Sequence, residues 1–219
     1  MIISQDIRRE FPDLQVLESK VEGVTVKRMD SELEEFKEEI FNEIRETYDL
    51  EGLKDRPILR AYRNFFWRLD VDPTKTRPAA EALIRRLLHG KPLPRINTLV
   101  DAYNLASVKT EIAICAFDSD ILAGELIMRY ASPGEEFFGI GMKRPIRLRG
   151  GEIVLSDEER LLAIYPYRDA EDAKITESTK NVLFIFCGVP GISLQNLMRA
   201  RDLTLNFVIR FCGGVVKEE

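Results

Sequence analysis

Three polar side chains between residues 95 and 106 have types and a spacing that could do chemistry. Asn97, Asp101 and Asn104 stand at positions i, i+4 and i+7, so a helix would place them on one face. Asn and Asp are poor helix formers because their short side chains compete for backbone hydrogen bonds. A helix that carries all three either presents a polar pocket wall or has a solvated face, and both interpretations stay open.

Further polar residues follow segments that are apolar enough to form strands. Asp118 comes directly after residues 112–117, and Arg168 with Asp169 comes directly after residues 161–167. If these strand ends lie near the polar helix face, their side chains could line one cleft. Each Asp could instead cap a turn, which is a common role for that residue type. Only convergence in space would favour a site over separate caps.

The residues needed for several common enzyme chemistries are missing. The chain has one histidine, His89, which we place near a helix C-terminus, where a cation complements the helix dipole. This leaves almost no material for a Ser-His-Asp triad or a histidine-rich metal site. Gly139 and Gly141 lack the third glycine and the following helix of a dinucleotide fingerprint. We therefore expect no metal and no cofactor.

The composition is typical of a single globular domain. The 219 residues are 45% hydrophobic and 32% charged, and a chain of this length can bury about 70% of its unfolded surface without disulfides or metals. Three widely separated cysteines favour buried thiols in a reducing compartment. The chain lacks a signal-peptide pattern and any apolar run near the ~18 residues that span a bilayer. We predict a cytoplasmic protein without a membrane segment, and its high charge leans toward a thermophile.

The charges are unevenly distributed along this acidic chain. The net charge of −5 argues against indiscriminate nucleic-acid binding, and we expect no DNA partner. Local basic segments could still grip one RNA end, although each cation by itself is most simply a solvated or ion-paired side chain. The candidate RNA-binding residues are Arg77, Lys91, Arg95, Lys143, Arg144 and Arg147.

The segment 58–68 is rich in aromatic side chains flanked by arginines. Tyr62, Phe65, Phe66 and Trp67 could stack on nucleic-acid bases. At helical spacing such side chains are more often part of the core, and we favour that interpretation.

The hydrophobic pattern predicts an α+β fold. Two β-prone runs occupy residues 14–28, and helices are expected at 31–48, 58–68, 78–90 and from Asn97 onward. Strands are expected at 112–117, 122–130, 136–140, 145–148, 153–155, 161–167 and 182–189, before a helix at 193–211. We predict that Ser31 caps the first long helix and that residues 149–152 turn a β-hairpin. Because helices precede a run of strands, the sheets should be mixed or mostly antiparallel and layered with helices.

These motifs also occur in an order that is similar to a known family. The chain resembles the B3/B4 domain of the phenylalanyl-tRNA synthetase beta subunit, and above all the free-standing members of that family. Residues 57–212 would be the family core and residues 1–56 an N-terminal strand and helix portion of one domain, 1–219. The matching motifs are Arg95-Ile96-Asn97, Leu99-Val100-Asp101, Tyr103-Asn104, Ala116-Phe117-Asp118, Pro12-Asp13-Leu14, Val71-Asp72-Pro73-Thr74-Lys75, Arg77-Pro78-Ala79-Ala80-Glu81-Ala82-Leu83, Gly134-Glu135-Glu136-Phe137, Arg168-Asp169 and Lys174-Ile175-Thr176-Glu177-Ser178-Thr179-Lys180-Asn181.

The resemblance implies a three-layer β/β/α fold and a tRNA-associated role. In the synthetase this domain hydrolyses the ester of tRNA that wrongly carries tyrosine, so we expect a stand-alone deacylase of misacylated aminoacyl-tRNA. Backbone donors and polar side chains can place water for such hydrolysis without a protein nucleophile. By this resemblance Asn97, Asp101, Asn104 and Asp118 would be catalytic and would orient water and the terminal ribose.

The resemblance also implies a substrate-binding set. Arg168 would contact RNA phosphate or the substrate carbonyl, and Glu136 would bind the free α-amino group. The full set is Cys115, Glu136, Arg168, Asp169, Thr176 and Ile185.

The chain departs from the family pattern at two places. Cys115 stands where synthetase editing domains commonly have a histidine, and the strand 182–187 lacks the acid that reads the tyrosine hydroxyl. A pocket lined by Cys115, Ile185 and Phe186 would prefer a smaller or more apolar amino acid. Two alternatives stay open: a non-catalytic module that binds tRNA, and a sensor of a free amino acid. The oligomeric state stays open as well.

Overall fold

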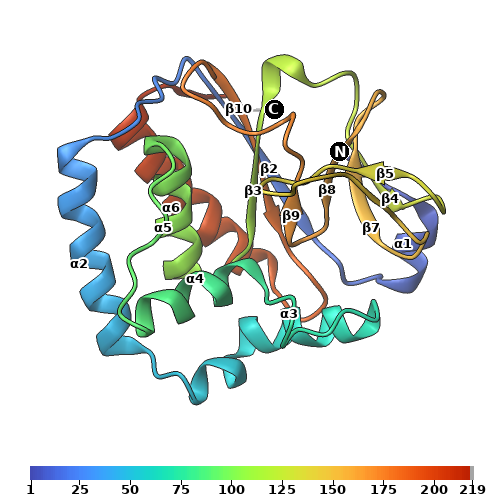
Figure 1. Ribbon diagram of the computed structural model, residues 1–219, viewed down its shortest axis with the longest axis horizontal. Coiled ribbons are helices and arrows are strands. Elements are labelled where there is room, and N and C mark those ends of the chain that lie inside the picture. Colours follow the sequence, from blue (N-terminus) through green and yellow to red (C-terminus); the bar gives the residue numbers. More distant parts are fainter. Residues whose placement is uncertain (218–219) are drawn as a thin grey trace.

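Two β-sheets stacked face to face form the centre of the molecule. The computed structural model describes residues 1–217, and Figure 1 shows the helices on one side and the sheets on the other. One sheet has the strand order β11-β2-β10-β3, and all of its pairs are antiparallel. Its strands are β2 (Val16–Glu22), β3 (Ile114–Asp118), β10 (Asn181–Cys187) and β11 (Val215–Lys217).

The second sheet has the order β1-β4-β7-β8-β9, with a parallel pair at β1 and antiparallel pairs elsewhere. Its strands are β1 (Ile2–Ile3), β4 (Ile127–Tyr130), β7 (Ile153–Ser156), β8 (Leu161–Ile164) and β9 (Arg168–Asp169). A separate hairpin consists of β5 (Glu136–Phe137) and β6 (Ile146–Arg147). Beyond β5 the backbone runs along β9, because Ile140 N–H donates to Asp169 O and Glu171 N–H donates to Phe138 O, each at 2.9 Å. Residues 138–140 therefore extend the second sheet by one edge.

Helices form the third layer, on the free face of the four-stranded sheet. In Figure 1, α5 and α6 lie between that sheet and α2, and α3 and α4 lie below them. The helices are α1 (Gln5–Glu10), α2 (Ser31–Thr47), α3 (Pro57–Arg68), α4 (Ala79–Leu88), α5 (Thr98–Thr110) and α6 (Leu194–Cys212), with short 3-10 turns at Gly52–Asp55 and Ser119–Ile121. The order of elements confirms the predicted α+β class with mostly antiparallel sheets.

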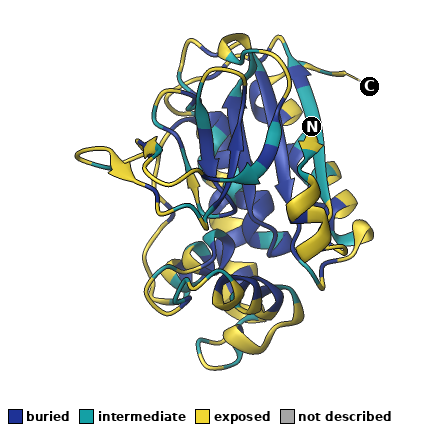
Figure 2. Ribbon diagram, turned by 90° about the vertical axis from the view of Figure 1, so that its right-hand side faces the viewer, coloured by how far each residue is buried: buried dark blue, intermediate teal, exposed yellow. Residues whose placement is uncertain are grey.

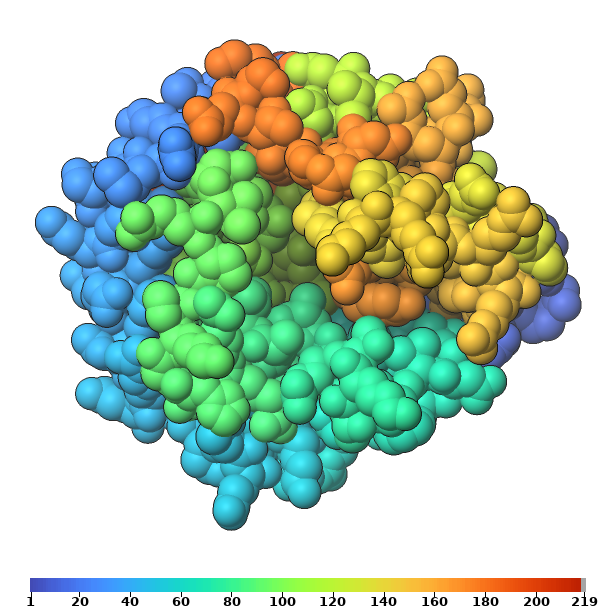
Figure 3. All heavy atoms as spheres, in the orientation of Figure 1, coloured from blue at the N-terminus to red at the C-terminus, as the bar shows by residue number. Residues whose placement is uncertain are grey.

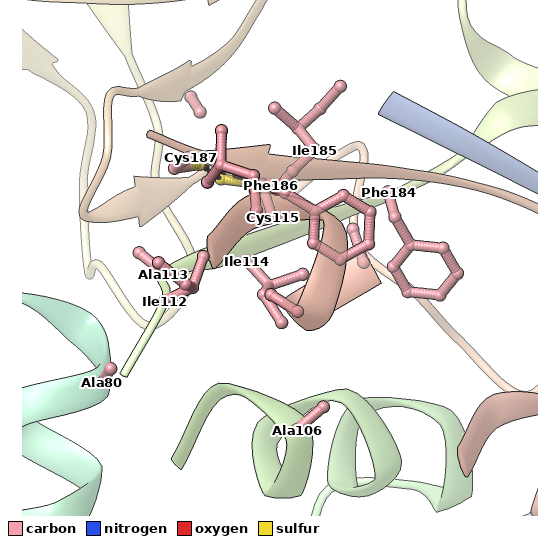
Figure 4. Packing of buried hydrophobic residues seen from close by; sticks show 14 of the residues in the cluster. Ala80, Ala106, Ile112, Ala113, Ile114, Cys115, Phe184, Ile185, Phe186 and Cys187 are labelled. Carbon is pink, nitrogen blue, oxygen red and sulfur yellow. Dashed lines mark hydrogen bonds between the residues drawn. The ribbon is translucent and has the colours of Figure 1, made fainter. Parts of the chain in front are cut away.

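The central strand β10 separates the two halves of the core. Its residues 182–187 are buried, and Figure 4 shows Phe184 and Phe186 pointing toward α5 while Ile185 and Cys187 point away from it. This alternation follows from the period of two along a strand. On the helix side, the ring of Tyr103 packs edge-on against Phe184 with centroids 6.1 Å apart. On the other side, the Tyr165 hydroxyl donates to the Gly188 carbonyl and so joins the two sheets.

The aromatic helix α3 is mainly part of this core, as predicted. Tyr62, Phe65 and Phe66 are buried, and the Tyr62 hydroxyl donates to the Cys187 carbonyl. Trp67 differs, because 55% of it is exposed. In Figure 2 the buried residues fill the sheets, and the β5–β6 hairpin projects from the body as an exposed arm.

The predicted β-hairpin at residues 149–152 is wrong. The strand before these residues, β6, pairs with β5, and the strand after them, β7, pairs with β4 and β8. The Glu152 carboxylate instead accepts hydrogen bonds from the N–H groups of Arg149, Gly150 and Gly151 at 3.0–3.1 Å. These three hydrogen bonds from backbone N–H groups to one carboxylate stabilise the loop. The loop connects β6 of the hairpin to β7 of the five-stranded sheet.

Other boundaries differ for local reasons. The first residue of α2 is Ser31, but its cap is Asp30, whose carboxylate accepts from the N–H groups of Glu32 and Leu33. Only residues 16–22 of the predicted β-prone runs 14–28 form a strand. The predicted strand 161–167 ends early, at Ile164 in β8, because Pro166 has no N–H to donate to a ladder, and the separate strand β9 begins at Arg168, beyond the predicted range.

Candidate functional site

Asn97 begins the helix that carries the candidate catalytic face. It is the N-cap of α5, where its Oδ1 accepts from the Val100 N–H at 2.9 Å. Its Nδ2 donates to the Ile175 carbonyl at 3.3 Å. Both polar atoms of this buried amide are thus used, and they join the start of α5 to the segment before Thr176.

Asp101 lies one turn further along and is buried in an ion pair. Its carboxylate pairs with the Lys37 ammonium of α2, and its Oδ1 accepts from the Ile96 N–H at 3.1 Å. Lys37 also donates to Glu34 Oε1 at 2.6 Å, and both members of the Lys37–Asp101 pair are almost fully buried. This carboxylate therefore holds α2 against α5.

Asn104 differs from its two neighbours on this face. It is half-buried, and its side chain makes no hydrogen bond within residues 1–217. The adjacent Tyr103 has a pKa raised well above its usual value by burial and by the nearby carboxylates of Asp169 and Asp101 together with Cys115. Of the three predicted side chains on the face, the Asn104 amide is the one whose polar groups the fold leaves unused.

Asp118 and Thr176 are brought together by a tight turn. The Thr179 hydroxyl donates to Asp118 Oδ2 at 2.7 Å and accepts from the Thr176 N–H at 3.0 Å. Asp118 Oδ1 accepts from the Asp120 N–H at 3.1 Å. These hydrogen bonds join the end of β3 to residues 176–179. The preceding residue, Ile175, is the one whose carbonyl accepts from Asn97.

Cys115 and Asp169 face each other between the sheets. The Asp169 carboxyl lies within hydrogen-bonding reach of the Cys115 thiol and the Ala116 N–H. Burial raises the pKa of Asp169 to about 6, against the opposing effect of these two donors and of Arg168. The hydrogen bond with Cys187, 3.5 Å away, burial and the Asp169 carboxylate together raise the pKa of the Cys115 thiol. A neutral thiol is a poor nucleophile, so Asp169 is the group here that can exchange a proton near neutral pH.

A hollow opens on the face of the molecule shown in Figure 3. Its borders are the green surface of α5 and the segment before it, the orange segment near residues 170–180, the yellow hairpin segment near residue 140 and the teal segment near residues 70–80. Residues far apart in the sequence thus surround one recess. Asn97 and Asn104 belong to the first of these segments and Thr176 to the second, which directly follows Asp169 in the chain.

Ile185 and Phe186 do not share a pocket wall. Ile185 is fully buried on the same face of β10 as Cys187, whereas Phe186 points to the opposite face, toward α5 (Figure 4). The interpretation that Cys115, Ile185 and Phe186 line one pocket is therefore wrong for Phe186, since neighbouring strand residues alternate.

The hairpin carries several of the predicted charged residues. Glu136 and Arg147 are opposite each other on β5 and β6 and form an exposed ion pair at 3.5 Å. Arg168 is exposed, and its Nη1 donates to the Ile140 carbonyl at 3.0 Å. Lys143 and Arg144 are exposed and have no ion pair within residues 1–217.

The other predicted RNA-binding residues lie nearer the helices. Arg95 is exposed and pairs with Glu34 Oε2 at 2.6 Å. Arg77 and Lys91 are exposed and without an ion pair in the described part of the chain. Sequence reasoning missed Lys37, because the pattern of an amphipathic helix favours a solvated lysine. The one indication in the sequence is that Lys37 lies four residues from both Leu33 and Phe41, which puts it on the apolar side of that helix.

Neither a metal-binding cluster nor a membrane-spanning helix is found among the described residues. Across residues 1–217 no three His, Cys, Asp or Glu side chains gather in a way that could hold a metal ion. None of the described helices has the length and apolar character required to cross a bilayer.

Comparisons with known proteins agree with this architecture. A family model described as B3/4 domain matches residues 61–219. The phenylalanine–tRNA ligase beta subunits of Fusobacterium nucleatum, Psychrobacter arcticus and Mycoplasma genitalium are 33%, 31% and 25% identical over 110, 87 and 128 residues. These alignments cover 49%, 40% and 58% of this chain but only 13%, 11% and 16% of those proteins.

A solved structure shares the fold across almost the whole chain. An N-terminal fragment of the phenylalanyl-tRNA synthetase beta subunit from Pyrococcus horikoshii matches 98% of this chain and 49% of its own, with a TM-score of 0.52 and 16% identity. At 16% identity the match supports a shared fold and no shared function. Together with the family model, which covers more than half of the chain, it leads to one conclusion. The chain belongs to the B3/4 domain family.

Proposed function

We propose that this protein is a stand-alone deacylase that removes wrongly attached amino acids from tRNA. The observation that carries the proposal is the recess bordered by α5, the hairpin and residues 170–180, a segment that directly follows an acid, Asp169, whose pKa is raised to about 6. The printed names of the relatives, phenylalanine–tRNA ligase beta subunits, support a tRNA-related partner. An acid of this kind is largely ionised at neutral pH and can still accept a proton.

The proposed reaction is the hydrolysis of an ester. A water molecule attacks the carbonyl carbon of the aminoacyl group, and the bond from that carbon to the ribose oxygen breaks. Asp169 accepts a proton from the attacking water and then returns it to the departing ribose oxygen. The free amide of Asn104 donates to the carbonyl oxygen as negative charge develops there. No cofactor is required in this scheme.

The remaining predicted residues act in this proposal by holding the recess. Asn97 and Asp118 fasten the ends of α5 and β3 to the segment 175–179, as their hydrogen bonds indicate. Asp101 fixes α5 against α2. Cys115 beside Asp169 favours a small or apolar amino acid over tyrosine, because a neutral thiol offers little to a buried hydroxyl. The Glu136 carboxylate would bind the free α-amino group.

The test is deacylation of a panel of mischarged tRNAs by the wild type and by two site variants. Asn104→Ala and Asp169→Asn should each slow release of the amino acid by about 100-fold on the preferred substrate. Asn42→Ala, which removes an exposed amide from α2, is the matched control and should leave the rate unchanged. A wild-type protein that releases no amino acid from any member of the panel contradicts the proposal.

A second function, tRNA binding without hydrolysis, is favoured by the exposed cations and the high pKa of Cys115. It predicts tRNA affinity that falls steeply with salt and no release of amino acid. The same panel separates the two functions, since binding is measured by filter retention and hydrolysis by the freed amino acid.

A further inference from the structure

The β5–β6 hairpin combines positive charge with exposed apolar surface. Residues 136–149 carry one acid, Glu136, and four cations, Lys143, Arg144, Arg147 and Arg149. The balance is 4 − 1 = +3 on this arm, in a chain whose net charge is −5. All four cations are exposed. The arm is therefore a local positive surface on an acidic protein.

Exposed apolar side chains lie among these cations. Phe138, Ile140 and Ile146 are each 40–41% exposed, although side chains of these types are usually buried. The backbone of Phe138 and Ile140 is held in place by β-type hydrogen bonds. Residues 138–140 pair with residues 169–171, and Gly139 lies opposite Ala170. An arm that carries both an exposed aromatic ring and exposed cations has the composition of a surface that binds unpaired bases.

The arm also has a pocket at its base. A cavity of about 370 Å³ is lined by apolar side chains that include Phe138, Pro145 and Leu161, and by three carboxylates and one cation: Glu136, Glu159, Asp172 and Arg160. The carboxylates disfavour a phosphate inside this cavity, while a neutral base could lie against Phe138. Phosphates would then follow Lys143 and Arg144 on the exposed turn, which borders the recess in Figure 3.

From these observations we infer that the β5–β6 hairpin is a single-stranded RNA-binding arm, in which Phe138 stacks on a base and Lys143, Arg144 and Arg147 contact successive phosphates. The inference rests on the proposed function only for the identity of the RNA, the unpaired end of an aminoacylated tRNA. The ring and the cations point to a polynucleotide rather than an acidic peptide, because a peptide carboxylate offers no flat face to Phe138.

The test measures binding of a fluorescein-labelled single-stranded RNA of eight nucleotides by anisotropy across a series of salt concentrations. Lys143→Ala combined with Arg144→Ala should weaken binding at least about tenfold at low salt and reduce the slope of log K against log salt by about 1.4, since each phosphate contact on a single strand contributes about 0.7. The matched control is Arg45→Ala combined with Lys54→Ala, which removes two exposed cations at α2 and the Gly52–Asp55 turn. An equal loss in the control overturns the assignment.

A second pair of variants isolates the ring. Phe138→Ala should lower affinity about tenfold at every salt concentration without changing the slope, and Phe138→Tyr should restore it, because stacking needs a flat face and no charge. Unchanged affinity in Phe138→Ala overturns the stacking role. Polyglutamate or inorganic polyphosphate that competes as well as unlabelled RNA would show a general anion surface and also overturn the inference.

These outcomes are distinct from those of the proposed function. Binding that depends on the arm, without hydrolysis of any aminoacyl-tRNA, supports the arm and contradicts the deacylase. Hydrolysis that is insensitive to all arm variants, at tRNA concentrations below saturation, supports the deacylase and contradicts the arm.

Discussion

Lys37 of α2 and Asp101 of α5 form a buried ion pair that fastens the outer helix to the helix bearing Asn97 and Asn104. The two residues are 64 positions apart in the chain, and Asp101 also holds the Ile96 N–H just before α5 begins. The pair therefore fixes both the position of α5 and the path of the chain into it.

Asp101→Asn should lower the free energy of unfolding by about 3 kcal/mol, because the change leaves a buried ammonium with only Glu34 as a charged partner. Glu43→Gln is a matched control, since Glu43 joins the same two helices through Lys109 at 2.5 Å but is largely exposed. That variant should cost less than about 1 kcal/mol. Urea unfolding followed by circular dichroism measures both. Equal losses would mean that burial of the Lys37–Asp101 pair has no special role.

Asn97→Ala and Asn104→Ala should have opposite profiles. Asn97→Ala removes the N-cap of α5 and should cost about 1–2 kcal/mol of unfolding free energy. Asn104→Ala removes an amide without a hydrogen bond in the described chain and should change stability by less than about 0.5 kcal/mol, since alanine favours the helix. The deacylation rate should fall with Asn104→Ala while its melting temperature stays near that of the wild type. Loss of stability in this variant would instead indicate a structural role for Asn104.

Asp169 should make the stability of the fold depend on pH. Burial raises the pKa of Asp169 from its usual 3.8 to about 6, so the folded state binds the proton more tightly than the unfolded state. The stability gained from this proton is present below about pH 4 and is lost as the pH rises to about 6. Asp169→Asn cannot ionise, so it should be more stable than the wild type at about pH 8, by up to roughly 3 kcal/mol. The difference should shrink toward about pH 4.

The measurement is a series of thermal or urea unfolding curves of both proteins across that pH range. A gap between wild type and Asp169→Asn that stays constant with pH would show that Asp169 has an ordinary pKa in the fold.

Gly188 lies against the backbone of Gln15 and the side chain of Leu197 of α6, and an added methyl group there should be costly. A Cβ at Gly188 would lie 2.2 Å from the Gln15 carbonyl oxygen and 2.9 Å from Leu197 Cδ1. Gly188→Ala should lower the free energy of unfolding by about 3 kcal/mol, because backbone must move to relieve the overlap. Gly151→Ala, where no atom lies within 4 Å of the new Cβ, should change it by less than about 0.5 kcal/mol. Similar losses in the two variants would contradict this account of the packing.

Local patterns predicted the large elements of this fold but not its long-range pairings. The apolar stripe of residues 31–48 and the apolar run 182–189 became α2 and β10 because burial depends on the periodicity of nearby residues. The two-residue strand β1 and the three-residue strand β11 were missed, since strands this short exist only through partners elsewhere in the chain. The turn at residues 149–152 was misinterpreted for the same reason, because glycine-rich loops between different sheets resemble hairpin turns in sequence.

The candidate site shows the same division. The spacing of Asn97, Asp101 and Asn104 correctly predicted one helix here, although Asn97 is its N-cap rather than a helical residue. Each side chain has a different environment, because Ile175 and Lys37 come from distant segments. The contact of Cys115 with Asp169 joins strands of different sheets, and neither residue carries a local signal for it. Sequence alone could therefore name these candidate residues but not their partners in the fold.

The edge formed by residues 138–140 ties the hairpin to the strand that carries Asp169. The Ile140 N–H donates to the backbone carbonyl of Asp169, while the carboxyl of the same residue lies near the Cys115 thiol. A single residue therefore anchors the hairpin through its backbone and contributes its side chain to the interior.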